Sequence, residues 1–151
     1  MLVLTINIKE KNYHLDVGHV GAELILPVLS QEGYGDVAMR YYSFYNGIIT
    51  ISFAPVKEDV ILYPDLIKIQ LSMEDGAIIG LDARSYLKNH KPRAIPDPAI
   101  DANAAMSAVG SRLAPLSAKL CLIPQNQREY LCYEVLAEGE GDRFLLYVDA
   151  R

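Results

Sequence analysis

The chain has 151 residues, of which 51% are hydrophobic and 22% are charged, a composition typical of a folded globular protein. A chain of this length buries enough surface to fold without a metal ion or a disulfide. Its net charge of −5 and its isoelectric point near 5.1 argue against a nucleic-acid-binding protein, which needs clustered Lys and Arg.

The N-terminus has no features of secretion or membrane insertion. Met1 is followed directly by Leu-Val-Leu-Thr-Ile, without a basic region or a long apolar stretch. The sequence nowhere approaches the run of about 18 apolar residues that a spanning helix requires. We therefore expect the chain itself to be soluble, an expectation that does not extend to a longer parent protein.

The first segment predicts a strand hairpin over residues 1–17. Leu4, Ile6 and Ile8 alternate with polar residues, which is the period of a half-buried strand, and residues 9–12 supply a polar turn.

A helix is predicted from Gly21 to Gln31, because the apolar residues of this segment recur at helical spacing. Gly33 stands where a C-terminal stop is expected. Pro27 opposes this prediction, since a proline in a helix interior costs about 3 kcal/mol.

Strands dominate the middle of the chain. A hairpin turn is expected at Asn46-Gly47, between two halves of a segment rich in Tyr and Ile. The predicted strand segments are residues 39–53, 60–63, 66–71 and 78–83. Residues 89–98 contain three prolines and are typical of a linker.

The last third repeats the order of a helix followed by strands. Asp101 is a suitable N-cap, and an apolar stripe follows it until Gly110. The predicted strands are residues 119–123, 129–135 and 143–149. Leu131, Tyr133 and Val135 alternate with Cys132 and Glu134, which predicts a sheet with one solvent-exposed face.

An internal repeat supports two similar units. Asp16, Asp82 and Asp149 each end a strand-like segment, at spacings of 66 and 67 residues. We predict an α+β fold of tandem units, each a helix packed on a short antiparallel sheet. The predicted parts are a hairpin remnant of a preceding repeat (1–17), a first unit (18–91), a linker (92–99) and a C-terminally truncated second unit (100–151).

The sequence shows no motif or spacing typical of a catalytic or metal-binding site. His14, His19 and His90 lack the spacing of a zinc site, and no phosphate loop or nucleophile elbow is present. Asp82 and its two equivalents are expected to bond backbone amides of turns. The sequence thus predicts no enzyme, no cofactor and no metal site.

The two cysteines leave one question open. Cys121 and Cys132 flank the turn of residues 124–128, so a hairpin there would bring them nearly opposite each other. Two scattered thiols are more often half-buried residues than a disulfide, and the sequence does not decide between these states.

The aromatic run Tyr41-Tyr42-Ser43-Phe44-Tyr45 is the unusual surface feature of the chain. In a strand, alternate residues of this run face the core and the solvent. The outward face predicts a partner surface, because Tyr is favoured in interfaces; the alternative is that aromatic pairs simply stabilise the sheet.

Two blocks then indicate a family. Tyr63-Pro64-Asp65 with the sequence that follows, and the block Tyr86-Leu87-Lys88-Asn89-His90, resemble the C-terminal region of the YpeB family of sporulation and germination proteins. Segments 120–124 and 131–135 resemble the last repeat of the same family. The resemblance covers most of the chain from about Gly21 onward, and it would make the two units PepSY domains.

This resemblance implies a non-catalytic module outside the cytoplasm of an endospore former, at the spore envelope on the outer face of the inner membrane. It implies a parent protein anchored in the membrane, of which this chain would be a fragment, and a spore cortex-lytic hydrolase as partner. The alternative is a structural protein that binds peptidoglycan. An open sheet also leaves a strand edge through which two copies could form a homodimer. The residues predicted to contact a partner are Tyr41, Tyr42, Tyr45, Tyr63, Asp65, Tyr86 and His90.

Overall fold

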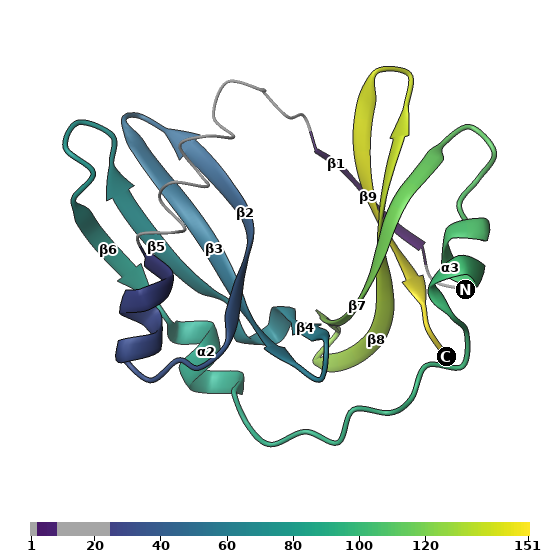
Figure 1. Cartoon of the computed structure of the whole chain (residues 1–151), viewed down its shortest axis with the longest axis horizontal. Helices are drawn as coiled ribbons and strands as arrows, with labels where there is room; N and C mark the ends of the chain where they lie inside the picture. The colour runs from purple at the N-terminus through teal and green to yellow at the C-terminus, as the bar shows by residue number, and fades with distance from the viewer. Residues whose placement is uncertain (1–2, 9–24) are drawn as a thin grey trace. The chain divides into compact units, whose positions relative to one another are not determined.

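The structure, a computed structural model, describes residues 3–8 and 25–151 (Figure 1). It is a mixed α+β fold with many strands and few helices, as predicted. The described residues divide into two compact units, residues 25–91 and residues 3–8 with 92–151. No helix in the described ranges is both long enough and apolar enough to cross a membrane.

The unit of residues 25–91 is built on an antiparallel sheet of order β2–β3–β5–β6. Its strands are β2 (Val37–Tyr45), β3 (Ile48–Lys57), β5 (Ile67–Ser72) and β6 (Ile78–Asp82). A short β4 (Val60–Leu62) pairs with the end of β3, and the 3₁₀-helix η2 (Tyr63–Asp65) follows it. Helix α2 (Arg84–Asn89), which the sequence did not predict, closes the unit.

The predicted helix before β2 is present over residues 25–31, while its residues 21–24 lie outside the described part. Ile25 and Leu29 are buried against Ile49, Ile51 and Phe53 of β3. Burial of a side chain of this size stabilises the fold by roughly 1.5–3 kcal/mol. The exposed Pro27 lies within the helical residues, on the side away from that core.

Gly33 ends this helix, as predicted. Its φ is +85°, and the backbone N–H groups of Gly33 and Tyr34 donate to the carbonyls of Ser30 and Leu29. These two bonds form a Schellman motif, in which glycine is favoured because a left-handed residue is required.

The turn between β2 and β3 is also confirmed. Asn46 and Gly47 both have positive φ, 50° and 75°, and they join Tyr45 to Ile48 as a two-residue hairpin loop. The primed turn that needs these angles matches the twist of the strands it connects.

The other unit has the antiparallel order β1–β9–β8–β7. The strands are β1 (Val3–Ile8), β7 (Ala114–Gln125), β8 (Arg128–Gly139) and β9 (Asp142–Asp149). The predicted strand at the N-terminus therefore exists, and its partner is β9. The rest of the predicted hairpin, residues 9–17, lies outside the described residues.

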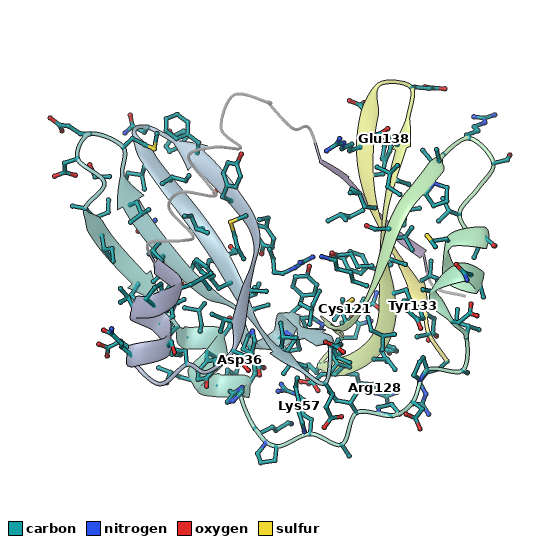
Figure 2. The ribbon with its side chains drawn as sticks, viewed as in Figure 1. Asp36, Lys57, Cys121, Arg128, Tyr133 and Glu138 are labelled. Carbon is teal, nitrogen blue, oxygen red and sulfur yellow. The ribbon has the colours of Figure 1, made fainter. Side chains whose placement is uncertain are left out.

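Helix α3 (Ala102–Ser107) begins as predicted. The carboxylate of Asp101 accepts a hydrogen bond of 2.7 Å from the N–H of Ala104, and Ala105 is fully buried. Tyr133, labelled in Figure 2, donates its hydroxyl to the carbonyl of Ile100 at 3.1 Å and so holds the start of α3 near β8.

The prediction of a solvent-exposed face on β8 is wrong. Cys132 and Glu134 are exposed by only 1% and 4%, so both faces of the strand are buried at this point. The Tyr147 hydroxyl of β9 donates to Glu134 at 2.9 Å and replaces water as the partner of the buried carboxylate.

Two of the three repeated aspartates have the predicted structural role. Asp82 accepts from the N–H of Arg84, and Asp149 accepts from the N–H of Arg151, both two residues further along the chain. Such bonds are typical of aspartate in turns. Asp16 lies outside the described residues.

Candidate functional site

The aromatic strand β2 lies at one edge of the sheet of residues 25–91. It pairs with β3, and no other described strand of this unit pairs with it. Tyr42 packs against the core, opposite Ile51. Tyr41 and Tyr45 face the other way and are 46% and 83% exposed, so alternate residues divide between core and solvent as strand geometry requires.

Phe44 deviates from that alternation. It is opposite Ile49 and therefore on the core side of the strand, but it is still 43% exposed. With Tyr41 and Tyr45 it makes the end of β2 near the hairpin turn rich in exposed aromatic area. We call these three residues the aromatic edge.

Tyr63 contacts a side chain of β2. The Nε of Arg40 donates to the Tyr63 hydroxyl at 3.1 Å, and the Arg40 guanidinium carbon lies 5.9 Å from the centre of the Tyr63 ring. The register of β2 against β3 shifts between Met39 and Tyr41, so Arg40 is the extra residue of a β-bulge. Bulges re-aim a side chain, which here reaches Tyr63.

The structure brings Asp65, Tyr86 and His90 together. The carboxylate of Asp65 is fully buried, and its Oδ2 lies 2.7 Å from Nδ1 of His90. The Tyr86 ring stacks on the imidazole, with 4.2 Å between ring centres and 14° between planes. Burial is the main cause that raises the pKa of the Tyr86 hydroxyl, and the charge of Asp65 adds to it.

Two further contacts complete this cluster, which joins α2 to η2. Nδ2 of Asn89 donates to the carbonyl of Pro64 at 2.8 Å. The ring of Tyr34 meets Tyr86 edge to face at 5.0 Å. The sequence did not point to Tyr34. Asn89, in contrast, belongs to the block of residues 86–90 on which the family resemblance was based.

A pocket of about 440 Å³ adjoins the same helix. Three cations and one carboxylate contribute to its lining, and Asp82 is already paired with Arg84 at 2.6 Å. The lining residues are Leu66, Lys68, Asp82, Arg84, Ser85, Lys88 and Asn89. The pocket was not predicted, because these residues come from the end of η2, from β5, from β6 and from α2, and only the fold brings them together.

The seven predicted partner residues thus lie in three places of one unit. Tyr41, Tyr42 and Tyr45 belong to β2, Tyr63 contacts Arg40, and the other three form the cluster of α2 and η2. Within the described ranges, no group of three or more His, Cys, Asp or Glu residues could hold a metal ion. A histidine oriented by a carboxylate can act as a base, but in the part of the chain that is described no hydroxyl or thiol side chain bonds His90.

Comparison with known proteins places this arrangement in a family. The family model described as YpeB sporulation, PepSY1 and PepSY2 domains, matches residues 18–96. The sporulation protein YpeB of Bacillus subtilis is 32% identical over 134 residues, which cover 87% of this chain and 30% of that protein. The sporulation protein YpeB of Halalkalibacterium halodurans is 32% identical over 107 residues, which cover 70% of this chain and 24% of that protein.

A solved structure is similar over nearly the whole chain. The Bacillus megaterium YpeB C-terminal domain superposes with a TM-score of 0.80 at 28% identity, covering 96% of this chain and 64% of that domain. The chain spans 30% or less of the length of the two curated relatives named above. Sequence and fold agree, and the chain belongs to the YpeB family of sporulation proteins.

Proposed function

We propose that this chain is a non-catalytic regulatory module of spore germination, which binds a spore cortex-lytic hydrolase and stabilises, localises or inhibits it. Membership of a sporulation family supports the setting. The module would work outside the cytoplasm, at the outer face of the spore inner membrane, as part of a longer membrane-anchored protein. The two units would be tandem PepSY domains, each a helix packed on a short antiparallel sheet.

The aromatic edge carries this proposal. Tyr45 is 83% exposed, and Tyr41 and Phe44 are each more than two fifths exposed. Large exposed aromatic side chains are enriched where proteins bind one another, because they offer contact area at a low cost in side-chain entropy. An edge strand adds main-chain donors and acceptors that an extended segment of a partner can pair with.

The test is direct binding of this chain to a purified cortex-lytic hydrolase, with cortex hydrolysis assayed in the same mixtures. We expect saturable binding, accompanied by lowered hydrolysis or by protection of the hydrolase from proteolysis. The double variant Tyr41→Ala/Tyr45→Ala should weaken binding at least tenfold, about 1.4 kcal/mol.

Ile79→Ala is the matched control, because Ile79 is 52% exposed on β6, the opposite edge strand of the same sheet. It should bind like the parent chain. Equal losses in both variants would contradict a role for the aromatic edge, and hydrolysis of cortex by the chain alone would contradict a non-catalytic module.

A second function is direct binding to peptidoglycan, which the pocket beside α2 favours. Lys68, Arg84 and Lys88 outnumber the one carboxylate of the lining, so the pocket suits an anionic group such as a peptide carboxylate. If the chain binds peptidoglycan through this pocket, the parent chain and the control Lys57→Ala should both be retained on insoluble peptidoglycan. The double variant Lys68→Ala/Lys88→Ala should not be retained. Binding to the hydrolase without retention on peptidoglycan would support only the first proposal.

A further inference from the structure

The two cysteines face each other across a strand pair. In the antiparallel ladder of β7 and β8, Cys121 is directly opposite Cys132. Opposed residues of such a pair project to the same face of the sheet. Both side chains are thiols, exposed by 0% and 1%. Figure 2 marks Cys121 on β7.

This register suits a cross-link between the two sulfur atoms. Opposed Cα atoms in an antiparallel pair are about 4.5–5.5 Å apart, inside the range of about 4.4–6.8 Å seen for disulfides. Their Cβ atoms are about 4.5–5.5 Å apart, whereas a disulfide prefers about 3.5–4.5 Å. The strands would therefore have to approach by about 1 Å, and the resulting strain makes such a bond easier to reduce.

We propose that Cys121 and Cys132 form a reversible redox site, in which a small external disulfide converts the two thiols into one cross-strand disulfide. This inference does not depend on the proposed function. It assigns chemistry to the unit of residues 3–8 and 92–151, whereas all predicted partner residues lie in the other unit.

The reaction balances through two exchange steps. One cysteine loses its proton, and its thiolate attacks the external disulfide, which forms a mixed disulfide and releases one thiolate of the reagent. The second cysteine loses its proton and attacks the protein sulfur of the mixed disulfide, which releases the second thiolate. Cys121 and Cys132 together lose two protons and two electrons, and the external disulfide is reduced to two thiols.

The surroundings of the two thiols predict a slow reaction. Burial, and then the charge of Asp149, raise the pKa of the Cys132 thiol to about 11, so little thiolate exists at neutral pH. Access requires local opening of the hairpin, which is connected by the two-residue turn Asn126–Gln127. Pro124 weakens the ladder near that turn, because proline has no N–H to donate.

The experiment equilibrates the purified, reduced full chain in buffers of increasing oxidised to reduced glutathione ratio, without denaturant. After acid quenching and alkylation of remaining thiols, intact mass and a non-reducing gel identify the products. We expect a monomer that takes up no alkylating reagent and is lighter than the reduced chain by about 2 Da. Excess reduced glutathione should return it to the dithiol.

A matched variant tests the register. Cys132→Ser/Arg128→Cys keeps two cysteines in the same hairpin, but residue 128 is exposed and is opposite Gln125 rather than Cys121. It should form glutathione adducts and no internal disulfide. The proposal is overturned if the parent chain, without denaturant, gives only reduced protein, glutathione adducts or linked dimers, or if reduced glutathione fails to open the bond.

Discussion

Nδ1 of His90 lies 2.7 Å from Oδ2 of Asp65, a carboxylate with no exposed surface, across 25 residues of sequence. His90 follows the last residue of α2, and Asp65 ends η2, so the pair joins the two ends of the β5–β6 hairpin region. A buried carboxylate is costly unless it is paired, and so this contact should matter more than a surface ion pair.

We expect His90→Ala to lower the free energy of unfolding by about 1–3 kcal/mol, because the mutation removes a partner of a buried acceptor. In an Asp65→Asn background the same mutation should cost less, since the carboxylate oxygen that His90 contacts has been replaced. Urea unfolding of the four proteins measures this coupling, with the exposed neighbour Lys91→Ala as control. A cost that is equal in both backgrounds would mean that the two side chains are not coupled.

The N-cap of α3 gives a second prediction. Asp101→Ala removes the acceptor of the Ala104 N–H and should destabilise the chain by about 1 kcal/mol. Asp97→Ala, which removes another exposed carboxylate from the preceding segment, should change stability by less than about 0.5 kcal/mol. Thermal unfolding of both variants makes the comparison, and equal shifts would indicate a charge effect rather than capping.

The local features of this fold could be predicted because a few adjacent residues determine them. Gly33 ends a helix, Asn46-Gly47 makes a hairpin turn and Asp101 caps α3, each through bonds that span no more than five residues. The α+β class could be predicted as well, because the spacing of apolar residues along the chain distinguishes strands from helices.

The site could be predicted only in part, since its contacts join distant segments. Asp65 and His90 were both proposed as partner residues, but nothing in the sequence pairs them with each other. The alternation on β8 suggested a solvent-exposed face, whereas Tyr147 of β9 supplies a buried partner to Glu134. Helix α2 escaped prediction because its six residues are too short for a clear hydrophobic period.

Glu134 itself provides a third prediction. Tyr147→Phe keeps the ring but removes the hydroxyl that donates to the buried carboxylate, so it should cost about 1–2 kcal/mol of stability. Tyr130→Phe, also on β8, is the control, and it should stay within about 0.5 kcal/mol of the parent chain. Similar values for the two variants would show that the Tyr147 hydroxyl contributes no specific bond.

The last prediction concerns the pH dependence of Asp82. The side-chain hydrogen bonds from Arg84, followed by the Arg84 N–H, lower the pKa of the Asp82 carboxyl well below its usual range. Because the folded pKa lies below the unfolded value of about 3.9, its contribution to stability is present above about pH 4. That contribution is lost as the pH falls through the lower, folded pKa.

Carboxyl NMR titration measures this pKa directly. Arg84→Gln should raise the pKa of Asp82 toward its ordinary value, though not fully, because the backbone bond from residue 84 and the charge of Lys68 remain. Arg128→Gln, an exposed arginine of the other unit, should leave the titration of Asp82 unchanged. If Asp82 titrated near 3.9 in the parent chain as well, the Arg84 contact would be too weakly populated in solution to hold α2 against the end of β6.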